Sequence, residues 1–135
     1  MTETRTPETK TLVLERRLPH ALDKVWRALT QSELMADWLM PNDFEPVVGK
    51  HFTLRTDPTP HWNGIVTGEV LAVEPMSRLV YSWYNMTVTL TLTPEPDGVL
   101  LRMEQAGFKD DNAYNGAQFG WTRFLGKLEE VVARA

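Results

Sequence analysis

The chain has 135 residues, no cysteine and a net charge of −4, with 42% apolar and 24% charged side chains. Its length predicts one domain, and its apolar share is that of an ordinary globular protein. The negative charge argues against a nucleic-acid partner, which needs a basic surface, and the lack of cysteine excludes disulfides and thiolate chemistry.

The first ten residues, MTETRTPETK, are polar and mixed in charge. We expect a disordered tail over 1–10 and a single domain over 11–135. The tail lacks the apolar core of a signal peptide, and no apolar run approaches the length of a membrane span. The sequence therefore predicts a cytoplasmic protein without a membrane partner.

A strand is predicted over 11–18, because Leu12, Leu14 and Leu18 alternate along it; Arg16 falls on the same face. Helical spacing follows over 22–30 and again over 31–40. We expect Ser32 to cap the second of these short helices.

Alternating apolar residues then predict five strands, separated by turns rich in Gly and Pro. They cover residues 49–57, 64–75, 78–84, 87–93 and 99–105. The clearest alternation is in the fourth, where Val88, Leu90 and Leu92 face the interior and threonines face away. Gln105 falls on the inner face of the last strand, which is otherwise apolar.

The chain closes with an amphipathic helix of about five turns. We expect its Gly120 to let the helix backbone approach a sheet closely, and Trp121 to span a wider gap beside it. The preceding stretch 109–116 is acidic. It is predicted to be a loop, either a lid over a cavity or a solvated connector in which Asp111 or Asn112 caps the helix.

The order of these elements predicts an α+β fold. Consecutive strands with short connections form antiparallel neighbours, and the long helix must bury its apolar stripe against a large surface. We therefore expect a curved six-stranded antiparallel sheet wrapped around the C-terminal helix, with two short helices after the first strand.

Five segments in this order resemble a known family. They are VWRALT…MADWLM, VGKHF, GEVLAVEPMSRLVYSW, VTLTLTPEPDGVLLRMEQAGF and GWTRFLGKLE. Over residues 11–134 the chain is similar to START-like (SRPBCC) domains, in particular to homologues of the C-terminal domain of the heat-shock protein 90 ATPase activator. The resemblance implies a helix-grip fold with a cavity between sheet and helix, in which relatives hold lipids, sterols, hormones or polyketide intermediates.

Candidate ligand contacts are the residues expected on inner faces. Arg16 and Gln105 are either polar anchors in the cavity or structural; we favour a structural role in which Arg16 pairs with Glu104 or Glu15 near a strand end. Met103 adds adaptable apolar surface. The other candidates, which serve as core or cavity lining, are Trp38, Phe52, Leu54, Trp62, Tyr81, Trp83, Leu90, Phe108, Tyr114 and Trp121.

No catalytic, metal or cofactor site is predicted. The three histidines share no metal-ligand spacing, and no serine lies in a nucleophile elbow. The first functional hypothesis is therefore non-enzymatic binding of a small apolar molecule such as a lipid, sterol or polyketide-like compound. The resemblance also suggests two alternatives. One is a chaperone-associated, ATPase-activator-like module, and the other is a cyclase- or hydrolase-like enzyme, which would need an inward-facing ionisable pair.

Overall fold

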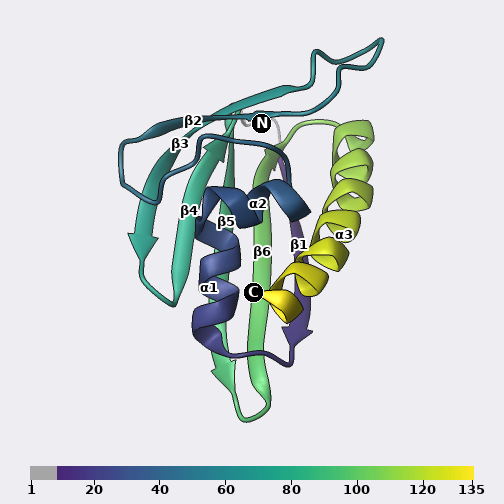
Figure 1. The fold of residues 1–135 in the computed structure, drawn as a ribbon. Helices are drawn as coiled ribbons and strands as arrows, with labels where there is room; N and C mark the ends of the chain where they lie inside the picture. Colours follow the sequence, from purple (N-terminus) through teal and green to yellow (C-terminus); the bar gives the residue numbers. More distant parts are fainter. Residues whose placement is uncertain (1–8) are drawn as a thin grey trace.

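A computed structural model describes residues 9–135 and shows the predicted α+β fold (Figure 1). Its elements are β1 (Lys10–Leu18), α1 (Leu22–Thr30), α2 (Ser32–Trp38), β2 (His51–Arg55), β3 (Ile65–Glu74), β4 (Arg78–Trp83), β5 (Met86–Glu95), β6 (Gly98–Phe108) and α3 (Asp111–Arg134). The strands form one antiparallel sheet in the order β1-β6-β5-β4-β3-β2. The curved sheet carries the helices on one face, which confirms the helix-grip arrangement.

The tail predicted over 1–10 lies for the most part outside the described residues. Lys10 is described and begins β1, where it pairs with Phe108 at the end of β6.

The two-residue period of the strands decides which side chains are buried. In β5, Val88, Leu90 and Leu92 are buried, while the threonines between them are more exposed. Branched and apolar side chains suit such a half-buried pleated surface. The β5–β6 register places Leu90 opposite Met103 and Val88 opposite Gln105. Gln105 is therefore buried next to apolar neighbours, as its strand position predicted.

The two short helices are held to the rest of the fold by Trp38. Its indole Nε1 donates a buried 2.7 Å hydrogen bond to the carbonyl of Ala28 in α1, and its ring lies 6.5 Å from that of Trp121 in α3. The capping prediction for α2 was wrong: Gln31 precedes the helix, and the Ser32 hydroxyl instead donates to the carbonyl of Asn42. Ser32 thus fixes the chain that leaves α2.

The long helix begins earlier than predicted. Its N-cap is Asp110, whose carboxylate accepts a 2.7 Å hydrogen bond from the backbone N–H of Ala113, so most of the expected loop 109–116 is helical. Asn and Gly in this stretch have low helix propensity, which made it resemble a loop. The cap and the edge-on packing of Tyr114 against Phe108, at 5.6 Å, stabilise the first turn.

The role predicted for Gly120 was also wrong. A Cβ atom placed on Gly120 would find its nearest neighbour, Cε2 of Phe124, 4.0 Å away, so no sheet backbone approaches the helix there. Close approach occurs at Gly68, where a Cβ would lie 2.1 Å from the carbonyl oxygen of Ser82. The space around Gly120, beside buried Trp121, belongs to a hollow under this part of α3.

Tyr81 is buried in an aromatic cluster, and its hydroxyl has no hydrogen-bond partner among the described residues. Its ring packs edge-on against Phe44 and Phe52, at 5.8 and 5.4 Å. An unpaired buried hydroxyl is costly because it loses its hydrogen bonds to water. We expect Tyr81→Phe to raise the free energy of unfolding by about 1 kcal/mol at pH 7 in urea denaturation. A loss of stability of that size would contradict the assignment.

The same variant changes the response to alkali, because burial raises the pKa of Tyr81 above the ordinary value of 10.0. Below pH 10 the phenol is protonated in both the folded and the unfolded chain. Above pH 10 the unfolded chain releases this proton and the folded chain keeps it, so Tyr81 lowers the free energy of unfolding by up to about 1.4 kcal/mol per pH unit. Tyr81→Phe should therefore lose less stability than the wild type between pH 9 and pH 11.

Candidate functional site

A cavity of about 810 Å³ lies between the sheet and the N-terminal half of α3. The sheet contributes an apolar wall from β3, β4, β5 and β6, together with one buried amide. The residues of this wall are Val66, Trp83, Met86, Gln105 and Phe108.

Small residues on α3 create the space. Ala113, Gly116, Ala117 and Gly120 all line the cavity and recur at helical spacing, so the helix presents no bulky side chain to the cavity over this stretch. Trp121 and Phe124 follow on the same lining, with their rings 5.6 Å apart and edge-on. On α3, the residues up to Gly120 therefore lie over the cavity, and the buried residues from Trp121 onward pack in the core.

Gln105 and Trp121 form a buried polar pair in the cavity wall, and each is only 2% exposed. Trp121 Nε1 donates a 2.7 Å hydrogen bond to Gln105 Oε1. An indole nitrogen can only donate, so this bond fixes which end of the carboxamide is the oxygen. The amide Nε2 then points to Met86, whose Sδ accepts at 3.6 Å. A thioether is a weak acceptor, so the Gln105 amide donor is poorly satisfied.

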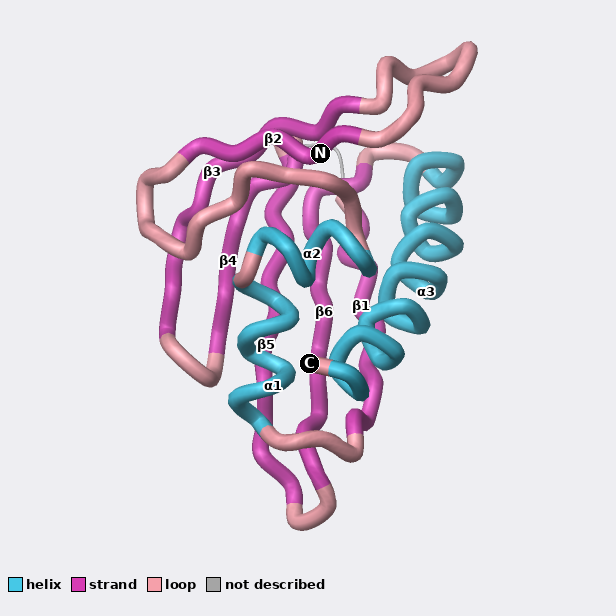
Figure 2. The backbone as a smooth tube through the Cα atoms, viewed as in Figure 1, coloured by secondary structure: helices cyan, strands magenta, loops and turns pink. Residues whose placement is uncertain are grey.

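Two hydrogen bonds join residues at one end of the cavity, where Trp62 and Tyr84 line it. We call the linked residues Trp62, Tyr84 and Ile65 the latch, and this end of the cavity its mouth. Trp62 Nε1 donates to Tyr84 Oη at 2.7 Å, and the Tyr84 hydroxyl donates to the carbonyl of Ile65. The latch ties the β2–β3 loop, which extends toward the start of α3 (Figure 2), to the turn between β4 and β5. Tyr84 has a φ of 56°, which suits the first position of the two-residue turn between Trp83 and Met86.

Removing the Tyr84 hydroxyl breaks both hydrogen bonds of the latch and should make this end of the cavity more mobile without unfolding the protein. We expect Tyr84→Phe to increase hydrogen exchange at the Trp62 indole N–H several-fold, because that donor loses its acceptor. Tyr84 is 46% exposed, so the free energy of unfolding should fall by less than about 1 kcal/mol. The buried Trp38 indole N–H is the internal control and should not change. Unaltered exchange at Trp62 would contradict a role for the latch.

The structure brings together five of the sequence-predicted candidates in the cavity wall: Trp62, Trp83, Gln105, Phe108 and Trp121. The remaining candidates lie outside it. Apart from Arg16 and the half-buried Tyr114, which packs on Phe108, they are buried in the core: Trp38, Phe52, Leu54, Tyr81, Leu90 and Met103.

Arg16 lies on the inner side of β1 but does not line the cavity. Its guanidinium donates a 2.7 Å hydrogen bond to the backbone carbonyl of Glu15. Neither carboxylate expected as its partner pairs with it, because Glu15 and Glu104 both pair with Arg102, at 3.2 and 3.4 Å. The prediction that Arg16 forms one of these ion pairs was therefore wrong.

The sequence analysis did not identify two groups of cavity-lining residues: the small residues of α3 and the residues from loops and turns. Gly120 was predicted to allow close approach to the sheet rather than to leave space, although the spacing of Gly116 and Gly120 was a usable signal. His61, Tyr84 and Asn112 also line the cavity, and they come from a loop, a tight turn and a helix start. No periodic pattern covers such positions.

Among the described residues, no Asp, Glu, Lys or Arg lines the cavity; His61 and Tyr84 are its titratable side chains. Within residues 9–135, no three His, Asp or Glu side chains gather as a metal site requires. Over the same range, none of the helices combines the length and apolarity needed to cross a membrane. The cavity thus offers apolar surface and hydrogen bonds rather than charge.

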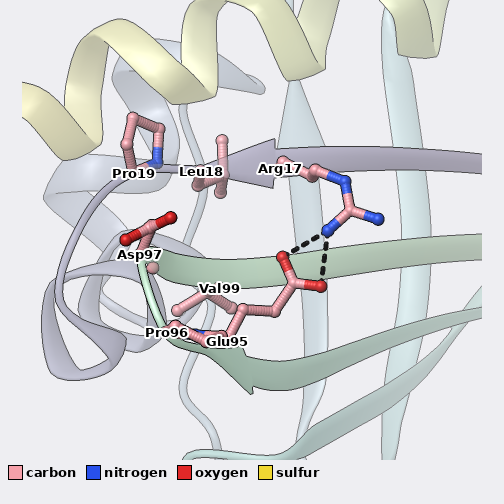
Figure 3. A pocket seen from close by; sticks show the side chains of 8 residues that line it. Arg17, Leu18, Pro19, Glu95, Pro96, Asp97 and Val99 are labelled. Atoms are coloured by element: carbon pink, nitrogen blue, oxygen red, sulfur yellow. Dashed lines mark hydrogen bonds and ion pairs between the residues drawn. The ribbon is translucent and has the colours of Figure 1, made fainter.

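A second hollow, of about 430 Å³, lies at the other end of the sheet, where β1 ends beside the β5–β6 turn (Figure 3). Arg17 and Glu95 line it and form a 2.5 Å ion pair with each other. Because these two charges already satisfy one another, they leave little for a ligand to bind. The cavity under α3 is the better candidate site.

Comparisons with known proteins agree with this fold. The family model described as Activator of Hsp90 ATPase homolog 1-like protein matches residues 19–133. The crystal structure of MLL2253 from Mesorhizobium loti is 45% identical, covers 93% of this chain and 98% of its own, and has a TM-score of 0.86. BH1534 from Bacillus halodurans is 26% identical over 91% of this chain and 96% of its own, with a TM-score of 0.79.

A third structure shows the likeness of fold alone. DynU16, described as a protein in the dynemicin biosynthetic locus, is 21% identical, with a TM-score of 0.82 over 91% of this chain and 47% of its own. No curated protein matches the sequence significantly.

Proposed function

The chain belongs to the Activator of Hsp90 ATPase homolog 1-like family, and we propose that it acts as a non-enzymatic binder of a small, mainly apolar molecule. The observation that carries this proposal is the cavity under α3, with its apolar wall and its buried Gln105 amide. At about 810 Å³ it is within the size range of small-molecule sites.

The lining favours a ligand that contains rings. Aromatic side chains come from the β2–β3 loop, from the sheet and from α3, so that a flat body would meet ring faces from several directions. They are Trp62, Trp83, Phe108, Trp121 and Phe124. Burial of apolar ligand surface against them supplies about 25 cal/mol per Å², and aromatic contacts add to this. Sterol-like and polyketide-like molecules fit this description, as do lipids with a cyclic part.

The enzymatic alternative has weaker support. A cyclase or hydrolase needs groups that donate and accept protons next to the reacting atoms, and a pair with separated pKa values is the usual sign. Among the described residues the cavity lining holds no carboxylate and no amine. The biosynthetic context of DynU16 belongs to that protein, whose likeness to this chain is one of fold.

The chaperone-associated alternative is supported by the family description, but it predicts a continuous apolar surface outside the cavity. The large apolar side chains exposed away from the cavity are spread over β1, the α2–β2 connection, β3, the β3–β4 turn and α3. They are Val13, Val47, Val48, Leu71, Met76 and Phe119. A pull-down with the heat-shock protein 90 chaperone of the source cell would favour this alternative if it captured stoichiometric complex.

Thermal denaturation with a panel of lipids, sterols and neutral ring ketones tests the proposal. A ligand at a hundredfold excess over its Kd stabilises the folded state by about 2.7 kcal/mol, which raises the Tm by several degrees. Absence of both a thermal shift and NMR shift changes across the panel would contradict the proposal. The cytoplasmic location expected from the sequence belongs to the same proposal, and cell fractionation would check it.

A further inference from the structure

We infer that Gln105 is a specificity-determining residue, and that it selects ligands whose buried end carries a neutral carbonyl oxygen. This inference rests on the proposed function, because it concerns the same cavity. It goes further in assigning a chemical group to the ligand and a position for that group beside the amide Nε2 of Gln105.

The first argument is the state of the Gln105 amide. Its Oε1 is occupied by the Trp121 indole, and its Nε2 donates to Met86 Sδ at 3.6 Å. This nitrogen carries two hydrogens, and sulfur is a weak acceptor even for one of them. A buried donor without a good acceptor costs free energy, which an oxygen supplied by a ligand would recover. Met86 is flexible and lines the same cavity, so it can give way to that oxygen.

The second argument is preorganisation. The Trp121 ring that orients Gln105 is held between Trp83 and Phe124, at 5.5 and 5.6 Å, with Trp38 at 6.5 Å. Its hydrogen bond prevents the carboxamide from turning its oxygen toward the cavity. The site therefore always presents a donor, and a ligand with an acceptor atom there loses little conformational entropy in forming the bond.

The third argument concerns charge. A carboxylate next to Gln105 would be buried beside a neutral amide, because no Lys or Arg of the described chain lines the cavity and His61, the basic residue of the lining, is exposed in the β2–β3 loop. Such burial of an incompletely paired charge is unfavourable. Arg123 and Lys127 line an adjoining hollow that shares Met40, Trp62, Gly120 and Phe124 with the cavity, so they attract anions at its rim rather than beside Gln105. The selected oxygen is therefore the uncharged carbonyl of a ketone, ester or amide.

Three matched probes test the inference by titration calorimetry: 2-acetylnaphthalene, 2-ethylnaphthalene and 2-naphthoate. They share one apolar ring system and differ in the group that would meet Gln105. We expect the ketone to bind about tenfold more tightly than the ethyl compound, as one net hydrogen bond provides. The carboxylate should also bind less tightly than the ketone.

The decisive variant is the double substitution Gln105→Leu/Trp121→Phe, which removes both members of the polar pair and so leaves no orphaned indole N–H. In this variant the preference for the ketone should fall below about twofold, since the amide donor of Gln105 is gone. Met86→Leu is the complementary variant. It removes the sulfur that competes for Nε2 and should increase the preference for the ketone.

The outcomes separate the inference from the proposed function. Equal affinity of the wild type for the ketone and the ethyl compound would overturn the inference while leaving small-molecule binding in place. A ketone preference that persists in the folded double variant would overturn it as well. Naphthoate binding as tightly as the ketone would overturn the neutral-oxygen assignment. If none of the probes bound at all, both the inference and the proposed function would be contradicted.

Discussion

Gly120→Leu is expected to weaken ligand binding at least tenfold while the protein stays folded. Gly120 lines the cavity, and a Cβ atom there would have Phe124 Cε2, 4.0 Å away, as its nearest neighbour. A leucine side chain there begins in open space and extends into space that the ligand needs. Glycine in a helix interior is less favourable than other residues by up to about 1 kcal/mol, so the variant should be as stable as the wild type or more so.

Gly126→Leu is the matched control for this experiment. Gly126 lies on the same helix and is exposed, and a Cβ atom there would meet no atom of residues 9–135 within 4 Å, but this residue does not line the cavity. Its substitution should give a similar gain in helix stability and no change in affinity for 2-acetylnaphthalene. Equal affinity in the two variants would show that the ligand binds elsewhere on the molecule.

Trp121→Ala is expected to lower the free energy of unfolding by about 3–5 kcal/mol, the range for removing a large aromatic side chain from a core. Trp121 is 2% exposed and contacts Trp38, Trp83 and Phe124. The substitution removes these contacts and also leaves the buried Oε1 of Gln105 without its donor. Urea denaturation of the two proteins gives the difference directly.

Phe119→Ala provides the comparison within α3. Phe119 lies two residues before Trp121 and is also aromatic, but it is 67% exposed. Its removal should change the free energy of unfolding by less than about 0.5 kcal/mol. A loss of less than about 1 kcal/mol in Trp121→Ala would mean that this residue does not join α3 to the sheet and to α2.

The fold could be predicted because its signals are periodic. The alternation of Val88, Leu90 and Leu92 identifies the inner face of β5, and the spacing of Trp121, Leu125 and Leu128 identifies the buried stripe of α3. Each pattern is local in sequence and depends only on strand or helix geometry. Topology follows from short connections between antiparallel neighbours.

The boundary between packed core and cavity could not be predicted in the same way. Tyr81 and Trp83 lie two residues apart on β4, yet Tyr81 is packed in the core and Trp83 lines the cavity. Phe52 and Phe44 enclose Tyr81, and Phe44 comes from the irregular segment between α2 and β2. A residue in such a segment follows no period, so its contacts become visible only in three dimensions.

The most direct test of the central claim is a titration followed through the indole N–H signals of the five tryptophans in ¹H–¹⁵N spectra, with 2-acetylnaphthalene as the ligand. If the hollow under α3 holds the ligand, the signals of Trp62, Trp83 and Trp121 will shift, and that of Trp26 on α1, which does not line it, will stay in place. If the three cavity signals stay unchanged up to the solubility limit, or if Trp26 shifts as much as they do, the cavity is not the binding site.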